Sequence, residues 1–191
     1  HTHPNNHAGY YPDAKQIALK LIFDPKTGEI LGGQGVGVDG VDKRIDVIAT
    51  AIRGGITAPE LADLELAYAP PFGSAKDPVN MLGYIAENMM SGLLKTAQWN
   101  ETQKYREAGY QLIDCRTPSE FGRGAIPGAI NIPVDEIRER VAEIKKEPIL
   151  VNCQVGQRGH TATMLLKELG FDATNLDGGY LTYSNSPASA N

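Results

Sequence analysis

The spacing of apolar side chains in the first hundred residues alternates between the two-residue period of strands and the longer period of helices. Residues 17–23 are typical of a strand, residues 24–28 of a turn, and residues 29–36 of the returning strand of a hairpin. Two helical segments follow, separated by a Pro-Pro pair at residues 70–71 that excludes regular structure. Their apolar positions are Val41, Ile45, Ile48, Ala49 and Ile52, then Met81, Ile85 and Met89. This mixture predicts an α+β domain.

From residue 100 onward, short apolar runs alternate with helical segments. Thr117, Pro118 and Glu120 form a capping signal in which a hydroxyl precedes the helix, proline starts it and a glutamate follows. Alternating strands and helices predict an α/β fold with a central parallel sheet. Predicted strands cover residues 110–113 and 149–152. One predicted helix begins after residue 117, and two others cover residues 134–144 and 161–169.

We therefore predict two domains: a first α+β domain over residues 7–92 and an α/β domain over residues 100–184, joined by a linker at residues 93–99. Of the 191 residues, 41% are apolar and 21% are charged, as in ordinary globular proteins. The net charge of −5 argues against nucleic acid as a partner. No apolar run approaches the roughly 18 residues that a membrane span requires.

Cysteine and histidine usage narrows the chemistry further. Two cysteines build no disulfide framework, which fits a cytoplasmic location. His1, His3 and His7 have no acidic or cysteine partner at ligand spacing, so no metal site is predicted.

One of the two cysteines, Cys153, lies where a predicted buried strand ends and a helix follows. Ligands bind at this carboxyl edge of α/β sheets. The four residues between Cys153 and Arg158 must turn tightly, which directs several backbone N–H groups towards one point. The loop residues are Gln154, Val155, Gly156 and Gln157, followed by Arg158 and Gly159.

Such a loop is typical of an activated cysteine. Its N–H groups, the helix dipole and the Arg158 cation all favour the thiolate, and comparable settings lower a cysteine pKa from about 8.5 to roughly 3.5–7.5. The alternative is a buried structural cysteine. The joint occurrence of strand, cysteine, glycine loop, arginine and helix favours the nucleophile. The short loop suits one sulfur atom better than a phosphate.

Residues 110–183 resemble a single-domain rhodanese, a sulfurtransferase fold, in the stretches LIDCRTPSEF, GAIPGAINIP, CQVGQRG and NLDGGYLTY. The resemblance implies that Cys153 accepts sulfane sulfur as a persulfide and delivers it to a thiol or another acceptor. It also implies that Arg158 lines the cradle and that Asp114 and Arg116 brace the loop. The sequence departs from the family pattern at Ala125, where many members have histidine, and at Cys115, where a β-branched residue is usual.

Cys115 has two interpretations. If adjacent strands bring it to Cys153, Cys115 is a candidate resolving thiol; a buried apolar filler is the interpretation we favour. The neutral side chains of Gln154 and Gln157 favour a persulfide or polysulfide donor over the thiosulfate dianion.

Residues 7–88 resemble the C-terminal dimerisation domain of flavin-dependent pyridine nucleotide–disulfide oxidoreductases, especially the coenzyme A–disulfide reductase branch. The matching stretches are HAGYYP, GVDKRIDVIATAI and LELAYAPPFGSAKDPVNMLGY. In that branch a rhodanese domain often follows, giving coenzyme A–disulfide or NADH-dependent persulfide reductases. The resemblance implies a homodimer through the first domain. It also assigns Tyr10 and Tyr68 to the partner's coenzyme A–disulfide site, although packing roles explain both tyrosines equally well.

The resemblance also implies FAD, NAD(P)H and coenzyme A for a full-length reductase. We find no FAD- or NAD-binding unit in the sequence and no N-terminal redox cysteine, so we expect the C-terminal part of a larger protein, with no cofactor bound by this part alone. The stretch GVGVDG at residues 35–40 imitates a dinucleotide fingerprint, but no second parallel strand follows.

Two functional hypotheses follow. The first is a sulfane-sulfur relay through a Cys153 persulfide, acting on small sulfur substrates: persulfide, polysulfide, and coenzyme A thiol or disulfide. The alternative is a non-catalytic dimerisation and docking module. A phosphatase on the same fold is disfavoured by the short loop.

Overall fold

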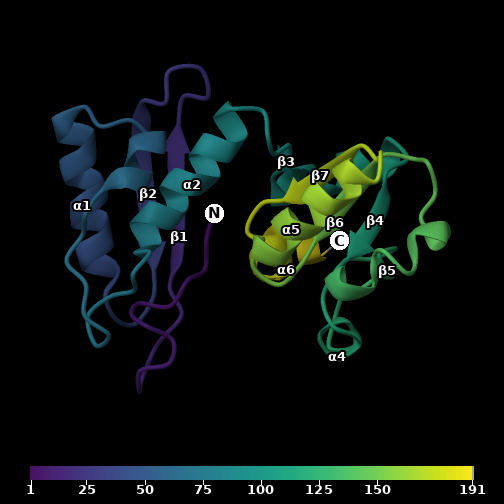
Figure 1. The fold of residues 1–191 in the computed structure, drawn as a ribbon, viewed down its shortest axis with the longest axis horizontal. Helices are drawn as coiled ribbons and strands as arrows, with labels where there is room; N and C mark the ends of the chain where they lie inside the picture. Colours follow the sequence, from purple (N-terminus) through teal and green to yellow (C-terminus); the bar gives the residue numbers. More distant parts are fainter. Residues whose placement is uncertain (191) are drawn as a thin grey trace. The chain divides into compact units, whose positions relative to one another are not determined.

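The chain folds into two compact units that divide between Leu93 and Leu94 in the computed structural model, which describes residues 1–190 (Figure 1). The first unit combines an antiparallel hairpin with helices, and the second has a parallel sheet with helices. The predicted fold class, an α+β domain followed by an α/β domain, is confirmed.

A tight turn at Asp24 starts the hairpin of the first unit. The Asp24 carboxylate accepts hydrogen bonds from the N–H groups of Lys26 and Thr27 at 2.7 and 3.1 Å. Gly28 has the left-handed φ of 77° that the turn requires. The elements of this unit are β1 (Ala18–Phe23), β2 (Ile30–Val36), α1 (Val41–Gly54), the 3-10 helix η1 (Pro59–Asp63) and α2 (Pro78–Met90).

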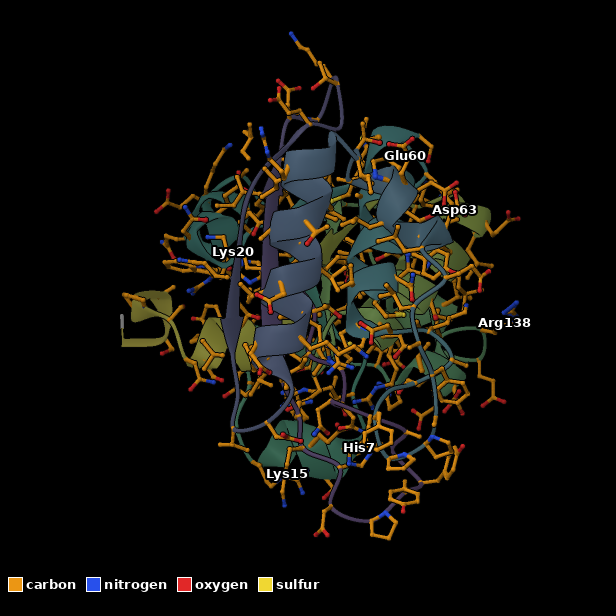
Figure 2. The ribbon with its side chains drawn as sticks, turned by 90° about the vertical axis from the view of Figure 1, so that its left-hand side faces the viewer. His7, Lys15, Lys20, Glu60, Asp63 and Arg138 are labelled. Carbon is orange, nitrogen blue, oxygen red and sulfur yellow. The ribbon has the colours of Figure 1, made fainter. Side chains whose placement is uncertain are left out.

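Close packing of α1 on β2 depends on a glycine. A Cβ added to Gly35 would lie 2.5 Å from Val41 Cγ1, so a larger residue there would push the helix away. The core-facing residues of α2 are Val79, Leu82 and Ala86. The predicted apolar positions Ile45, Met81, Ile85 and Met89 are only half-buried. Figure 2 views this unit with its side chains, and the exposed charges of Lys15, Glu60 and Asp63 lie at its periphery.

The second unit is built on five parallel strands in the order β3-β7-β6-β4-β5. Strand β3 lies inside the predicted linker at residues 93–99, so part of that linker belongs to this sheet. The strands are β3 (Thr96–Ala97), β4 (Gln111–Asp114), β5 (Ile130–Asn131), β6 (Ile149–Asn152) and β7 (Ala173–Leu176), and the α-helices are α3 (Thr102–Glu107), α4 (Pro118–Gly122), α5 (Gln157–Glu168) and α6 (Gly179–Ser184).

The predicted helix at residues 134–144 is wrong. The structure has two short 3-10 turns there, η3 (Val134–Glu136) and η4 (Val141–Glu143). Ile137 and Ile144 are both buried in the core of the sheet, and docking of these two anchors replaces a continuous amphipathic helix. This unit has two further 3-10 helices, η2 (Trp99–Glu101) and η5 (Pro187–Ala190).

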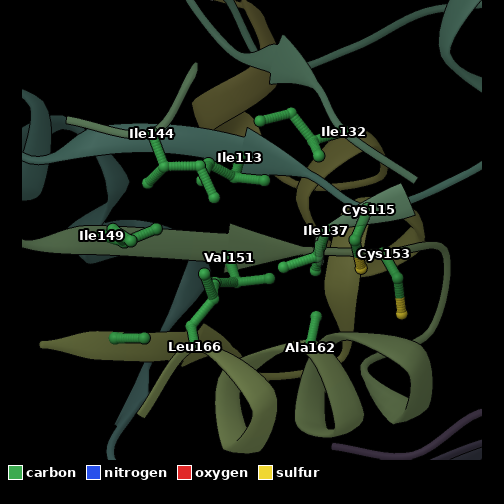
Figure 3. Close-up of a cluster of buried hydrophobic side chains, with 11 residues drawn as sticks. Ile113, Cys115, Ile132, Ile137, Ile144, Ile149, Val151, Cys153, Ala162 and Leu166 are labelled. Carbon is green, nitrogen blue, oxygen red and sulfur yellow. The ribbon is translucent and has the colours of Figure 1, made fainter. Parts of the chain in front are cut away.

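The core of the second unit is centred on β6, whose four residues are all buried. Figure 3 shows Ile113, Val151 and Leu166 packed together, with the two cysteines at one end of the same cluster. This packing fixes the end of β6, where the chain turns into α5. None of the helices within residues 1–190 is long and apolar enough to cross a membrane.

Candidate active site: the Cys153 loop

Cys153 directly follows β6, between the neighbouring strands β4 and β7. Helix α5 begins at Gln157, four residues earlier than the apolar pattern predicts, so only Cys153 to Gly156 separate strand from helix. Gly156 makes this possible with a left-handed φ of 96°. Cys153 therefore lies at the carboxyl edge of the sheet and at the start of a helix.

Backbone N–H groups surround the Cys153 sulfur. The N–H of Gly156 donates to Sγ at 3.1 Å, and the N–H groups of Val155 and Gly159 also hydrogen-bond to this atom. Cys153 itself is fully buried. Donors arranged in this way stabilise a negative charge on sulfur.

The surroundings lower the pKa of Cys153 to about 6. The largest cause is a hydrogen bond with the thiol of Cys115; burial opposes the shift, and the N–H groups of Gly159, Val155 and Gly156 reinforce it. The same contact raises the pKa of Cys115, together with burial. Cys153 is thus the thiolate of the pair and Cys115 the protonated donor. The sequence pattern pointed to N–H groups but not to this dominant partner.

Arg158 is held by a carboxylate. Its Nη1 and Nη2 donate to the two carboxylate oxygens of Glu120 at 2.8 and 2.6 Å. The pair lowers the pKa of Glu120 to about 2. The capping box predicted at Thr117 holds Glu120 in place, because the Thr117 N–H also donates to that carboxylate. The guanidinium charge of Arg158 is therefore largely balanced rather than free.

Asp114 and Arg116 form a buried ion pair beside the loop. Arg116 Nη2 donates to Asp114 Oδ2 at 2.7 Å, and Arg116 Nε lies 3.0 Å from both Asp114 oxygens. Arg116 Nη1 reaches Gln154 Oε1 at 3.1 Å, which connects the pair to the cysteine loop. Asn152 Nδ2 also donates to Asp114 Oδ2 at 3.0 Å. One side chain, Arg116, thus joins the end of β4 to the loop after β6.

The start of α6 clamps the same loop from the other side. Tyr180 N–H donates to Cys153 O at 2.7 Å, and Leu181 N–H donates to Gln154 O at 2.9 Å. Gly179 comes so close that an added Cβ would lie 2.5 Å from Cys153 O. The Arg116 guanidinium lies over the Tyr180 ring at 4.2 Å, a cation–π contact.

The sequence pattern assigned no role at this site to three of these residues: Glu120, which it predicted only as part of a helix cap, Gly179 and Tyr180. The role of Gly179 has a local signal, the glycine pair in the stretch NLDGGYLTY. Adjacent glycines permit two left-handed residues and a close backbone approach. The partnership of Glu120 with Arg158 spans 38 residues and has no local signal.

The predicted site residues Tyr10 and Tyr68 meet in the first unit. Their hydroxyl oxygens are 3.1 Å apart although 58 residues separate them in sequence. Both rings are exposed, Tyr10 by 77% and Tyr68 by 48%, so neither serves only to fill the core. The hydrogen bond with Tyr68 raises the pKa of Tyr10.

The glycine stretch at residues 35–40 and the His, Cys, Asp and Glu side chains are the remaining candidates for cofactor and metal binding. Gly35 and Val36 end β2, which pairs antiparallel with β1, and residues 37–40 form the loop before α1, so the glycines do not belong to the βαβ unit that holds a dinucleotide. Within the part of the chain that the structure describes, no three His, Cys, Asp or Glu side chains form a group able to hold a metal ion.

Two family models match the chain one after the other. Residues 1–78 match the pyridine nucleotide-disulphide oxidoreductase dimerisation domain, and residues 96–186 match the rhodanese-like domain. A coenzyme A disulfide reductase of Staphylococcus haemolyticus is 46% identical over 83 residues, which are 44% of this chain and 19% of that protein.

Solved structures match across both units. The reduced CoADR-RHD of Bacillus anthracis has a TM-score of 0.93 and 50% identity over 96% of this chain and 33% of its own. An NAD-dependent persulfide reductase from A. fulgidus has a TM-score of 0.85 and 38% identity over 95% of this chain and 33% of its own. The chain thus spans about a third of these solved relatives. It consists of a pyridine nucleotide–disulphide oxidoreductase dimerisation domain followed by a rhodanese-like domain.

Proposed function

We propose that Cys153 carries sulfane sulfur as a persulfide and passes it to a second thiol. The observation that supports this proposal is the lowered pKa of Cys153, which surrounding N–H groups and one thiol bring to about 6. At neutral pH the residue is then mainly thiolate, which is the form that attacks sulfur. A structural cysteine would need none of these donors.

The transfer takes place in two displacement steps. The Cys153 thiolate attacks the outer sulfur of a persulfide or polysulfide, the sulfur–sulfur bond of the donor breaks, and the donor leaves as a thiolate or shorter polysulfide. A second thiolate then attacks the outer sulfur of the Cys153 persulfide and restores the Cys153 thiolate. Because Cys153 is enclosed by its own loop, small donors and acceptors fit better than bulky ones.

Four other side chains position the loop in this proposal. Arg158 and Glu120 hold the first turn of α5 beside α4. Arg116, oriented by Asp114, holds Gln154 through its side-chain oxygen. Gln154, Val155, Gly156, Gln157 and Gly159 supply the loop and its N–H groups.

We further propose that this relay operates within a longer coenzyme A–disulfide, persulfide or polysulfide reductase that dimerises through the first unit. Such a reductase would use FAD and NAD(P)H, and residues 35–40 are not proposed as their site because β2 pairs antiparallel with β1. The paired hydroxyls of Tyr10 and Tyr68 are exposed donors suited to a departing coenzyme A thiolate. We also propose a cytoplasmic location, because a reducing compartment keeps thiols free for chemistry of this kind.

The test is the intact mass after brief treatment with polysulfide, measured without reductant. The native chain should gain the mass of sulfur, and a thiol acceptor such as coenzyme A should remove it. Cys153→Ser should gain none while its thermal unfolding stays the same, since serine is nearly isosteric. A gain that persists in Cys153→Ser would show that the sulfur is carried elsewhere and would favour a docking role for this site.

A further inference from the structure

The register of the sheet makes the two cysteines neighbours. In the parallel pair β4 and β6, Asp114 lies opposite Asn152, and Cys115 and Cys153 are the next residues of the two strands. The Cys115 N–H donates to Asn152 O at 2.8 Å, so backbone pairing continues to this point. Adjacent strands lie about 4.8 Å apart, within the roughly 4.4–6.8 Å between Cα atoms that a disulfide spans.

The two sulfur atoms also meet. Cys115 and Cys153 belong to the same buried cluster, where they are 1% and 0% exposed. Figure 3 shows both sulfur atoms at the same end of this cluster, and a hydrogen bond joins the two side chains. A bond between them therefore requires a change of side-chain rotamer rather than an opening of the fold.

We propose that Cys115 is a resolving thiol, which lets this site reduce sulfane sulfur to hydrogen sulfide as an alternative to transferring it. The inference rests on the proposed function, because it starts from the Cys153 persulfide. Cys115 would then be a second catalytic residue. If it only filled apolar space, valine would serve equally well at this position.

The reaction is balanced without a further oxidant. Cys115 Sγ attacks Cys153 Sγ, the bond between Cys153 Sγ and the outer sulfur breaks, and the Cys115–Cys153 disulfide forms. The outer sulfur takes both electrons of the broken bond and the proton of Cys115, and it leaves as hydrosulfide. The sulfane sulfur is reduced and the two cysteines are oxidised. Two molecules of a low-molecular-weight thiol restore the dithiol and leave as their own disulfide.

The order of events follows from where the charge lies. While Cys153 is a thiolate, Cys115 stays protonated because it donates to that sulfur and is buried. When Cys153 carries a sulfur atom, the negative charge lies on that outer atom instead of on Cys153 Sγ. The pKa of Cys115 is then raised less, and Cys115 loses its proton more easily. Cys115 is already in contact with the sulfur it attacks, whereas an external thiol must first enter, and proximity of this kind accelerates displacement strongly.

The experiment follows the fate of the added sulfur. Native chain, Cys115→Ser and Cys115→Val are loaded with polysulfide to the same extent, freed of excess reagent, incubated without thiol, then quenched in acid and weighed intact. The native chain should lose the added sulfur, reach its starting mass less two hydrogen atoms, and release one equivalent of sulfide. A peptide linked through Cys115 and Cys153 should appear. Both variants should keep the added sulfur and release no sulfide.

The outcomes separate this inference from the proposed function. If the native chain retains its sulfur as long as both variants, Cys115 is not a resolving thiol, while the persulfide carrier stands. If no chain takes up sulfur, the proposed function fails, and hydrogen peroxide becomes the probe. Peroxide converts the Cys153 thiolate to a sulfenate, which condenses with Cys115 to the same disulfide and water. A linked peptide then supports the resolving role, and a persistent sulfenic or sulfinic acid on Cys153 overturns it.

Discussion

The lowered pKa of Cys153 results from a few short-range hydrogen-bond donors that outweigh the effect of burial. A pKa lowered from 9.0 to about 6 corresponds to on the order of 4 kcal/mol in favour of the thiolate. A hydrogen bond to a charged group contributes about 1.5–3 kcal/mol, so the thiol of Cys115 and the surrounding N–H groups outweigh the cost of removing the charge from water. At the scale of single residues, the pKa of Cys153 depends on Cys115, at the end of the neighbouring strand, as much as on the loop itself.

The pH dependence of Cys153 alkylation should report the Cys115 donor. In the native chain the rate should rise with pH and reach half its maximum near pH 6, since the thiolate is the reactive form. Cys115→Val removes a donor to the charged form and should move this midpoint up by about one to two units. Cys115→Ser keeps an O–H donor and should move it less. Equal midpoints in the native and valine proteins would rule out this donor.

The Arg158–Glu120 pair predicts opposite effects for its two partners. Arg158→Gln leaves the carboxylate of Glu120 unbalanced near the loop, so the pKa of Cys153 should rise. Glu120→Gln frees the guanidinium, so the pKa of Cys153 should fall. Each shift should be a fraction of a unit, because partly exposed charges contribute roughly 0.2–1 kcal/mol. Alkylation rates across pH measure both, and shifts of the same sign would contradict the charge argument.

At the scale of elements, the site depends on how three segments meet around the end of β6. The segment after β4 contributes Arg116, the loop and first turn of α5 contribute N–H groups, and the backbone at the start of α6 donates hydrogen bonds to the loop. The loop is short, so it has little freedom once α6 is in place. Gly179 is the contact that permits this approach.

Replacement of Gly179 by alanine should damage both stability and reactivity. Its φ of 62° is left-handed, and the new Cβ would meet Cys153 O at 2.5 Å. Gly170→Ala is the matched control, because Gly170 has a φ of 87° but nothing within 4 Å of the added Cβ. The control should cost only the backbone strain of about 1–2 kcal/mol and leave Cys153 alkylation unchanged. Denaturant unfolding and alkylation rates measure the difference; equal behaviour would show that the loop tolerates displacement.

Local patterns predicted the elements better than the contacts between them. The hairpin turn at Asp24 and the capping box at Thr117 are sequence-local, and both are present. The helix at residues 134–144 failed because burial of two isoleucines outweighed helical propensity. The start of α5 was predicted too late, because its N-cap is Gly156 in a left-handed conformation and no capping side chain marks this position in the sequence.

The candidate site was predictable only in part. Cys153 and its loop are contiguous, so their chemistry shows in the sequence. The order of the strands in the sheet does not show in the sequence. The contact between Cys115 and Cys153 depends on that order, because β4 must lie beside β6 in register. For the same reason the pairing of Glu120 with Arg158 appears only in the folded chain.

At the scale of the whole molecule, the first unit leaves apolar surface uncovered. Leu31 and Val36 on β2 are 61% and 73% exposed, and Ile22 on β1 is 44% exposed. These side chains lie on the hairpin and are not covered by the helices of the same unit. This surface agrees with the dimerisation family that residues 1–78 match.

We expect the chain to form a homodimer through the first unit. Light scattering across a dilution series should give twice the chain mass, and Leu31→Asp with Val36→Asp should halve it by placing charge on apolar surface. Ile130→Asp is the matched control, because Ile130 is 43% exposed but belongs to the second unit. A native chain that is monomeric at every concentration, or a control that dissociates as readily, would contradict this assignment.

The N–H groups around the Cys153 sulfur come from the main chain. Activation of the thiol by these groups is therefore independent of the side chains that would contact a substrate. Any residue except proline at position 155 offers the same N–H, and the side chain at position 157 is exposed. If Cys153 carries sulfur as proposed, the main-chain part of its activation depends on the path of the backbone, while the choice of sulfur donor depends on replaceable side chains. Such a site can acquire a new substrate without rebuilding its reactive centre.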